Sequence, residues 1–330
     1  MPLPRLVTSP SLSARQAADV AALQRETARA DGVSALSEQT MLLARPGSVA
    51  AFHVMAYAGD RLVGYAQLAG GERWGGGEPS GELVVSLRHR RQGVGTQLWG
   101  ALASENGAVR VWAHGSLPGA QALAASLGLV AVRELHKMAR LLTPADLAPA
   151  ELPTGFRARA FERGRDEDAW LSANAEAFAG HPEQGRLARA DLEARMAQPW
   201  FDPSGFILLE HEDQPGTVAA FHWTKIEPAP PPTGADAERD RDGNGDGDGD
   251  APAEGEVYAL GVRPAYQGRG LARPLTRLGL AHLAAKGVRE AVLYVDGDNA
   301  AALATYRREG FRSIMVDVMY ARGGHHLLSG

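Results

Sequence analysis

Hydrophobic residues follow two spacings along the chain, and their alternation predicts a mixed α/β fold. Three stretches place apolar residues three or four positions apart, which indicates amphipathic helices at residues 14–30, 166–178 and 187–197. Apolar runs of strand length lie at residues 52–70, 205–210 and 217–226, and the first reads as a hairpin that turns at Gly59 and Asp60. Both halves share one order: helices, a β-meander, then βαβα and a last strand. We therefore predict α/β domains of the α+β type, each with a mixed sheet.

An internal repeat indicates that the chain is a duplicated domain. LVVSLRHRRQGVG at 83–95 aligns without gaps on LGVRPAYQGRGLA at 260–272, an offset of 177. VWAHGSLPGAQALAASLGL at 111–129 aligns in the same way on LYVDGDNAAALATYRREGF at 293–311, an offset of 182. Two matches in the same order favour duplication, and 330 residues suit two cores. We predict domains at 1–140 and 156–330, joined by a linker at 141–155 whose three prolines disfavour regular structure.

Composition limits the environment and the partners. The net charge of -5 comes from residues 236–254, which hold eight acidic and two basic residues, so the remainder is close to neutral and does not favour nucleic acid as a partner. We predict a disordered acidic insertion at 228–255, because its Pro, Gly and Asp residues cannot form a core. A calcium loop is disfavoured because no Asp of this segment begins a twelve-residue loop that ends in Glu.

The chain contains no cysteine, which excludes disulfides, thiolate metal sites and a cysteine nucleophile. No apolar run reaches membrane length, and the first residues lack the pattern of a secretory signal. We therefore expect a cytoplasmic protein without a metal, a membrane or a nucleic-acid partner, and we expect a monomer.

Both copies of the repeat carry a glycine-rich turn between a strand and a helix. The turns read RRQGVG at 90–95 and QGRGLA at 267–272. Glycines at a helix start let the backbone approach a diphosphate, which then meets unpaired N–H groups and the positive end of the helix dipole. A single turn of this kind more often reflects tight packing. Two copies in the same context favour an anion-binding cradle.

These turns resemble the diphosphate-binding motif of the GNAT acetyltransferase superfamily, whose members bind acetyl-CoA. The resemblance implies two tandem GNAT domains. It also implies that the preceding strands, with Leu83 to Val85 and Leu260 to Val262, bulge and separate from a neighbour to hold the pantetheine arm. A backbone N–H freed in this way can stabilise the oxyanion that forms when an amine attacks the thioester.

Two residues of the second copy are candidates for proton transfer. Asn299 reads as a helix N-cap, and Tyr306, seven residues later, resembles the superfamily's general acid, although a tyrosine at that spacing also packs in a core. Glu256 opens the strand that leads to the second cradle and suits a general base, although a Glu at a strand start is often only solvated. At the repeat offsets, Ala124 and Pro79 replace Tyr306 and Glu256 in the first copy. We therefore assign the chemistry to the second domain and regard the first as non-catalytic.

Several phrases extend the resemblance over nearly the whole chain, to the mycothiol synthase family of tandem GNAT enzymes. The phrases include VWAHGSLPGAQALAASLG, HPEQG at 181–185, WFDPSGF at 200–206, FHWTK at 221–225, GEVYALGV at 255–262 and LYVDGDN at 293–299. That family acetylates the cysteinyl amine of cysteinyl-glucosaminyl-inositol (desacetylmycothiol). The resemblance implies an amine pocket lined by Glu38, Glu183, Lys225, Glu256 and Tyr294.

The same resemblance implies acetyl-CoA contacts in both domains. In the first domain they are Leu83, Val84, Val85, Arg91, Gln92, Gly93, Val94, Gly95 and Thr96. In the second they are Leu260, Gly261, Val262, Gln267, Gly268, Arg269, Gly270, Leu271, Ala272, Arg273, Asn299, Ala300, Ala301, Ala302, Leu303 and Ala304. Two alternatives remain open: a tandem GNAT enzyme for another amine, such as an aminoglycoside or a protein N-terminus, and a CoA-binding sensor without catalysis. Intact Glu256 and Tyr306 disfavour the sensor.

Overall fold

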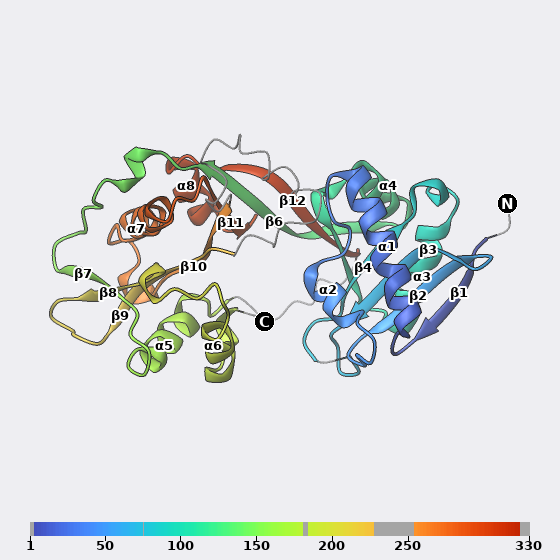
Figure 1. Cartoon of the computed structure of the whole chain (residues 1–330), viewed down its shortest axis with the longest axis horizontal. Coiled ribbons are helices and arrows are strands. Elements are labelled where there is room, and N and C mark those ends of the chain that lie inside the picture. The colour runs from blue at the N-terminus through green and yellow to red at the C-terminus, as the bar shows by residue number, and fades with distance from the viewer. Residues whose placement is uncertain (1–2, 75, 181–183, 228–253, 324–330) are drawn as a thin grey trace, which may run out of the picture. The chain divides into compact units, whose positions relative to one another are not determined.

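The computed structural model describes residues 3–74, 76–180, 184–227 and 254–323, and its described chain divides into two compact units. Unit 1 comprises Met1–His136, Asp296–Asp298 and Met315–Gly330, and unit 2 comprises Lys137–Val295 and Asn299–Ile314. Figure 1 shows the elements in chain order by colour and label. Two long strands, β6 (Leu129–Leu141) and β12 (Arg312–Arg322), contribute residues to both units. Each unit therefore contains strands from both halves of the sequence.

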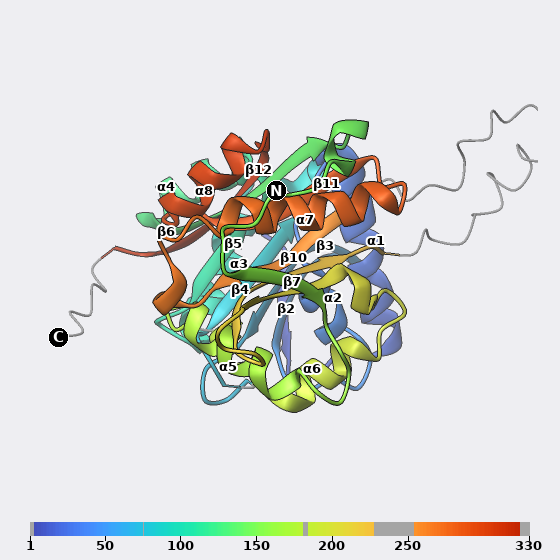
Figure 2. The same cartoon turned by 90° about the vertical axis from the view of Figure 1, so that its left-hand side faces the viewer.

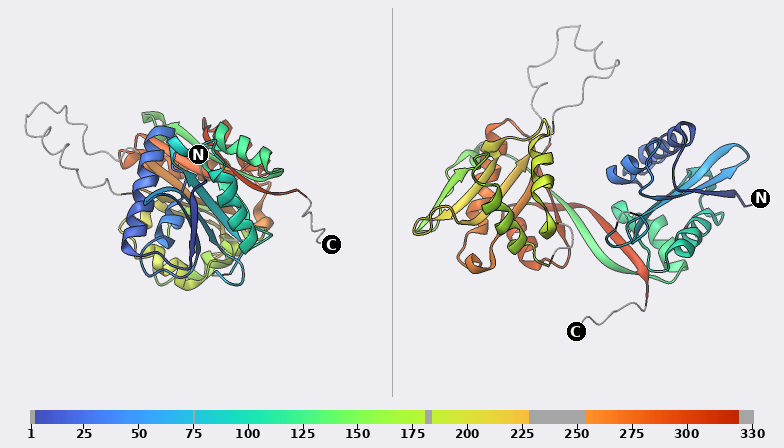
Figure 3. Two further views of the ribbon diagram at one scale, coloured as in Figure 1. Left: turned by 90° about the vertical axis from the view of Figure 1, so that its right-hand side faces the viewer. Right: turned by 90° about the horizontal axis from the view of Figure 1, so that it is seen from below.

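Unit 1 is built around an antiparallel meander. Its elements are β1 (Arg5–Ser9), α1 (Ala14–Asp31), α2 (Glu38–Leu43), β2 (Phe52–Ala58), β3 (Arg61–Ala69), β4 (Ser80–Val85), α3 (Val94–Glu105), β5 (Arg110–Ala113) and α4 (Pro118–Ser126). Strands β1 to β4 pair antiparallel in order, β4 pairs parallel with β5, and β12 pairs antiparallel with β5. Helices cover both faces, because one apolar cluster packs Leu98 of α3 against the sheet and another packs Val20 of α1. Figure 3 (left) shows the blue helix α1 and the teal helix α3 on either side of these strands.

Unit 2 repeats this architecture. Its elements are β7 (Phe156–Ala160), α5 (Glu167–Ala177), α6 (Arg189–Met196), β8 (Phe206–His211), β9 (Val218–Lys225), β10 (Glu254–Val262), α7 (Ala272–Ala285), β11 (Glu290–Asp296) and α8 (Ala300–Arg308). Strands β7 to β10 pair antiparallel in order, and β10 pairs parallel with β11. Figure 2 shows α7 on one face of these strands and α5 and α6 on the other. The aromatic core under α5 stacks Phe206 between Phe161 and Trp223, with centroids 4.4 and 4.2 Å away.

The expected fold class and the expected elements are confirmed. The helix expected at 14–30 is α1, which begins at the N-cap Ser13 and ends at Gly32 with a φ of 71°. The hairpin turns between β2 and β3, and the expected strands of the second half are β8 and β9.

Two local expectations were wrong. In the proposed linker, Pro144–Leu147 forms a 3-10 turn, because a proline suits the first helical position and Thr143 and Asp146 cap it. The expected insertion at 228–255 ends earlier, since Glu254 and Gly255 already pair in β10; residues 228–253 lie outside the described residues. The domain limits at 140 and 156 stay predictions.

Candidate functional site

Strands β10 and β11 of unit 2 separate part of the way along their length. Their parallel register runs from Glu254 opposite Glu290 to Val257 opposite Leu293, whereas β10 continues along β9 as far as Val262. Beyond Val257, the edge of β10 that faces β11 is therefore released from the ladder. Free backbone N–H groups in such an opening can bind an amide-containing ligand and stabilise an oxyanion.

A β-bulge lies at the same point. The register between β10 and β9 shifts between Val257 and Ala259, which makes Tyr258 the extra residue. A bulge resets the alternation of faces along a strand. Before it, Val257 packs with α7; after it, Ala259 packs into the cluster under α5, while Leu260 packs with α7. The bulge and the separation are the two strand features that the superfamily resemblance implies.

The two glycine-rich turns have the same backbone shape. The left-handed φ of Arg91 (63°) and Gly93 (83°) recurs at the equivalent Gly268 (76°) and Gly270 (75°). A side-chain donor also closes each turn in the same way, since Arg90 donates from Nε to the Val85 carbonyl and Gln267 from Nε2 to the Val262 carbonyl, both at 3.2 Å. Helices α3 and α7 begin directly afterwards. Both turns thus direct backbone N–H groups at the start of a helix, as an anion cradle requires.

Glu309, directly after α8, holds the first turns of α7. Its buried carboxylate accepts from Arg273 Nε at 2.6 Å and from Arg277 Nε at 2.9 Å. Burial raises the pKa of Glu309, but the hydrogen bonds from Arg277 and Arg273 outweigh burial and leave the pKa lowered. Arg273, an expected acetyl-CoA contact, is therefore fixed by an ion pair from the helix that carries Tyr306.

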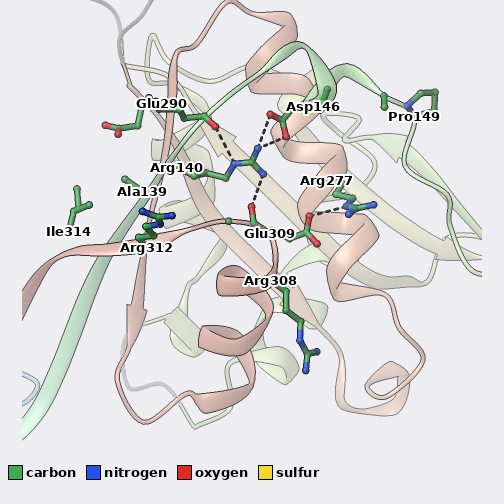
Figure 4. A pocket seen from close by; sticks show the side chains of 14 residues that line it. Ala139, Arg140, Asp146, Pro149, Arg277, Glu290, Arg308, Glu309, Arg312 and Ile314 are labelled. Atoms are coloured by element: carbon green, nitrogen blue, oxygen red, sulfur yellow. Dashed lines mark hydrogen bonds and ion pairs between the residues drawn. The ribbon is translucent and has the colours of Figure 1, made fainter.

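A pocket of about 770 Å³ lies next to this ion pair, and Arg277 and Glu309 are among the residues that line it (Figure 4). Neither the turn at 267–272 nor Glu256 lines this pocket. At its centre Arg140 donates to the Asp146 carboxylate at 2.7 and 2.8 Å and to the Glu309 carbonyl at 2.7 Å. The pocket is thus bounded by paired charges that tie the segment after β6 to α8.

Glu256 lies opposite Lys225 on the neighbouring strand β9. Burial is the largest effect on Glu256 and raises its pKa. The positive charges of Lys225 and Lys137 lower the pKa, and the negative charges of Glu254 and Glu227 raise it. The net result is a pKa above the ordinary value of a glutamate. A carboxylate with a raised pKa is a stronger base than a solvated one, which suits proton abstraction near neutral pH. The environment of Glu256 therefore differs from that of an ordinary solvated strand end.

An aromatic pair surrounds Lys225. Its ammonium lies 5.3 Å from the ring centroid of Trp200 and 5.8 Å from that of Tyr258, and the two rings are 5.1 Å apart. Lys225 also pairs with Glu227 at 2.5 Å, and Arg195 donates from Nε to the Tyr258 hydroxyl at 2.8 Å. Sequence reasoning did not single out Trp200, Tyr258 or Arg195, although Trp200 begins the phrase WFDPSGF and Tyr258 lies in the phrase GEVYALGV.

Tyr294 on β11 is 46% exposed, so it is not a core residue despite its apolar strand. The ammonium of Lys137 lies 5.9 Å from its ring centroid, and the same ammonium pairs with Glu254 at 3.0 Å. In the parallel register Tyr294 falls on the face of Glu254 and Glu256. Lys225, Glu256 and Tyr294 thus share one face of unit 2.

Tyr306 lies on the opposite face, in the apolar cluster that contains Val257 and Leu293, the last paired residues of β10 and β11. Its side chain is 8% exposed, its ring is 5.8 Å from that of Phe311, and burial raises its pKa to about 12. Tyr306 is therefore protonated at neutral pH, as a general acid must be before transfer. Asn299 is the N-cap of α8 as expected, since its side chain accepts the Ala302 N–H at 3.1 Å.

Of the remaining predicted pocket residues, Glu38 is the exposed first residue of α2 in unit 1, and Glu183 lies outside the described residues. In the described ranges, no group of three or more His, Cys, Asp or Glu side chains is arranged to hold a metal ion. Within the same ranges, every helix is too short or too polar to cross a membrane.

Comparison with known proteins places the chain in a family. The model of the acetyltransferase (GNAT) family matches residues 19–129 and 168–311, one match in each half. The mycothiol acetyltransferase of Streptomyces scabiei is 45% identical over 318 residues, which cover 96% of this chain and 94% of that protein. The mycothiol acetyltransferase of Thermobispora bispora is 46% identical over 305 residues, 92% of this chain and 95% of that protein.

Solved structures show the same fold at low identity. A GCN5-related N-acetyltransferase from Sphaerobacter thermophilus has a TM-score of 0.65 at 23% identity, covering 96% of this chain and 94% of its own. A tandem GNAT protein of the clavulanic acid biosynthesis pathway has a TM-score of 0.66 at 18% identity, covering 97% and 99%. The mixed sheet, the paired cradles and the full-length relatives agree, and the chain belongs to the mycothiol acetyltransferases, a family of GNAT N-acetyltransferases.

Proposed function

We propose that the protein transfers the acetyl group of acetyl-CoA to the cysteinyl amine of 1D-myo-inositol 2-(L-cysteinylamino)-2-deoxy-α-D-glucopyranoside, giving mycothiol and CoA. The observation that carries the proposal is the identity of 43 to 46% with mycothiol acetyltransferases over nearly the whole chain. The site is chemically suited to this amine, because carboxylates attract a cationic group and Lys225 and Tyr294 add donors for a polyhydroxylated substrate.

The residues of unit 2 divide the work of acetyl transfer. The turn at 267–272 and Arg273 hold the diphosphate of acetyl-CoA, and the released edge of β10 holds its pantetheine arm and polarises the thioester carbonyl. Glu256 removes a proton from the amine, directly or through water, so that nitrogen can form its bond to the acetyl carbon. Tyr306 donates its proton to the sulfur as the carbon–sulfur bond breaks.

Unit 1 has a different role in this proposal. Its turn at 91–96 has the backbone shape of the second cradle, so we assign it a bound acetyl-CoA. Ala124 stands at the position equivalent to Tyr306 and has no proton to transfer. The ungapped offset pairs Glu256 with Pro79, but Tyr258 is an extra residue of β10, and the register instead makes Ser80 the equivalent: Ser80 pairs with Arg110 as Glu256 pairs with Val292. Neither Pro79 nor Ser80 carries a carboxylate. The domain limits, the other acetyl-CoA contacts, a monomeric state and a cytoplasmic location belong to the same proposal.

The proposal is tested by acetylation of a panel of amines at saturating acetyl-CoA, with product detected by mass. The panel contains the cysteinyl-glucosaminyl-inositol, glucosaminyl-inositol without the cysteine, an aminoglycoside and a peptide with a free N-terminus. We expect the highest kcat/KM by far for the first. A clear preference for the aminoglycoside or the peptide would assign the enzyme to another amine, and binding without turnover of any amine would make it a CoA-binding sensor.

A further inference from the structure

A buried histidine of unit 2, His222 on β9, connects the two features of the site where we expect acetyl-CoA to bind. It lies opposite Leu260 on β10, on the stretch of that strand that is released from β11. Its Nδ1 lies 2.9 Å from the carbonyl oxygen of Leu275, the fourth residue of α7. The Leu275 N–H in turn donates to the Leu271 carbonyl at 3.1 Å, and Leu271 belongs to the glycine-rich turn at 267–272. One side chain therefore joins the released strand to the start of the helix that follows the turn.

The His222 ring is neutral, and its contacts fix the tautomer. A carbonyl oxygen can only accept, so Nδ1 carries the proton and donates it to Leu275. Nε2 is buried and has no hydrogen-bond partner among the described residues. The side chain is 0% exposed, and burial lowers the pKa of His222 to about 4; the hydrogen bond to Leu275 opposes this effect and the charge of His282 adds to it. At neutral pH the contact with α7 is therefore a hydrogen bond between two uncharged groups.

The first copy of the repeat fills the same place without a polar group. In the register of β3 with β4, Ala66 takes the place of His222, and at the repeat offset of 177 Leu102 takes the place of Gly279 on the helix. Ala66 and Leu102 belong to one apolar cluster. In unit 2 a Cβ on Gly279 would overlap the His222 ring, so the ring lies directly against the backbone of α7. A small strand residue and a large helix residue thus suffice for packing, and what the histidine adds is the hydrogen bond to α7.

We propose that His222 is a positioning residue for acetyl-CoA: by donating to the Leu275 carbonyl, it fixes the start of α7 and the turn at 267–272 relative to the released stretch of β10. The inference rests on the proposed function, in which the turn holds the diphosphate and β10 holds the pantetheine arm of the same ligand. A ligand that contacts both elements binds best when their spacing is fixed before it arrives. The alternative is that His222 only fills the core under α7.

Two variants of the full chain separate the hydrogen bond from the packing. His222→Leu removes the donor and keeps most of the volume, whereas His222→Asn keeps an N–H donor at the position of Nδ1 and leaves a cavity. The KM for acetyl-CoA is measured at saturating amine, together with kcat and Tm. His222→Leu should raise this KM about five-fold, the net value of one uncharged hydrogen bond, with kcat within about two-fold of wild type. His222→Asn should lower Tm more than His222→Leu and yet keep the KM within about two-fold of wild type.

A swap variant and a control complete the set. His222→Ala combined with Gly279→Leu rebuilds in unit 2 the apolar pair of the first copy, and it should show the raised KM of His222→Leu with a filled core. His53→Leu replaces an equally buried histidine of unit 1 and is the matched control; it should lower Tm and leave the KM for acetyl-CoA unchanged. Should one of the three unit 2 variants fail to fold, the other two decide, because each is compared with wild type on the same KM.

A wild-type KM in His222→Leu or in the swap variant, or a KM in His222→Asn as high as that in His222→Leu, would overturn the inference. Failure of the proposed function is separate, because it appears as absent turnover of the cysteinyl-glucosaminyl-inositol by the wild type; the KM for acetyl-CoA is then measured with whichever amine of the panel is acetylated. If none is, hydrogen exchange of residues 267–275 decides. His222→Leu should need about five times more acetyl-CoA than His222→Asn to protect this segment, and equal concentrations, or no protection in either variant, would refute the positioning role.

Discussion

Gly261→Ala places one methyl group on β10 at the position where we expect the pantetheine arm of acetyl-CoA to bind. A Cβ at Gly261 would lie 2.6 Å from Phe221 Cζ and 2.7 Å from Phe221 Cε1, about an ångström inside ordinary contact, and 3.1 Å from the Ala177 Cβ. Phe221 is 0% exposed, and its ring is held 5.5 Å from the Trp170 centroid and 6.3 Å from that of Phe178. Because Phe221 cannot retreat, β10 must move.

The size of the effect follows from the cost of overpacking, about 1 to 3 kcal/mol for a methylene forced into a filled core. If β10 moves to relieve the clash, the free energy of acetyl-CoA binding becomes less favourable by about this amount. That change corresponds to a KM for acetyl-CoA about 5 to 150 times higher. The assay is steady-state acetyl transfer at saturating amine, because turnover reports only the site that performs the chemistry. Phe221→Leu should rescue most of the loss in the double variant, because it shortens the clashing side chain.

The matched control is Gly119→Ala in α4, where a Cβ meets nothing within 4 Å. At the position equivalent to Gly261, the first copy carries Val84, which pairs with Tyr65 on β3 as Gly261 pairs with Phe221 on β9. Val84 and Tyr65 share one apolar cluster, so a side chain on that strand is compatible with the fold where the opposing ring leaves room for it. A wild-type KM for acetyl-CoA in Gly261→Ala would refute the reasoning. So would a raised KM that Phe221→Leu leaves unchanged.

Two further predictions concern pH. Lys225→Met should raise the pKa of Glu256 further, since Lys225 lowers that pKa more than Lys137, the other cation that opposes burial. The acid limb of the kcat/KM profile should then move to higher pH, and a limb that stays in place would contradict this. The raised pKa of His114 means that its contribution to stability should be full below pH 6.5 and lost as the pH rises through about 9. The pKa values of Glu82 and Asp317 are lowered, so their contribution should be lost as the pH falls below their ordinary pKa values of 4.5 and 3.8. The gap in Tm between wild type and His114→Gln should therefore close toward alkaline pH. A gap independent of pH would be inconsistent with a protonated His114 that bonds Glu82 Oε1 at 3.1 Å and Asp317 Oδ2 at 2.9 Å.

Much of the fold could be predicted because its signals are local. The hairpin at Gly59, the N-cap at Asn299 and the two turns each lie within a few residues of sequence, and the repeat offset correctly paired Arg91 with Gly268 and Gly93 with Gly270. The expectation that residues 141–155 lack regular structure was wrong at Pro144–Leu147, because a proline starts a helical turn as readily as it ends one.

The rest depends on pairings between distant residues. Strands β6 and β12 contribute residues to both units, and the spacing of their apolar residues does not predict this. An alternating pattern indicates a strand but not which strand it pairs with. The aromatic surroundings of Lys225 likewise require knowing that Tyr258 is the bulged residue and that Trp200 packs against it. The raised pKa of Glu256 results from burial and from charges on other strands, so a sequence motif alone does not predict it.

The assignment of chemistry to unit 2 is tested most directly by comparing two carboxylates, Glu256 on β10 and Glu82 on the equivalent strand β4. Both variants, Glu256→Gln and Glu82→Gln, preserve shape and remove one charge, and kcat is measured for each at saturating acetyl-CoA and cysteinyl-glucosaminyl-inositol. We predict that Glu256→Gln lowers kcat by about 10² to 10⁴, the usual contribution of a general base, with acetyl-CoA binding retained. Glu82→Gln should keep kcat within about two-fold of wild type. A loss of kcat in Glu82→Gln with normal turnover in Glu256→Gln would place the chemistry in unit 1 and contradict the account.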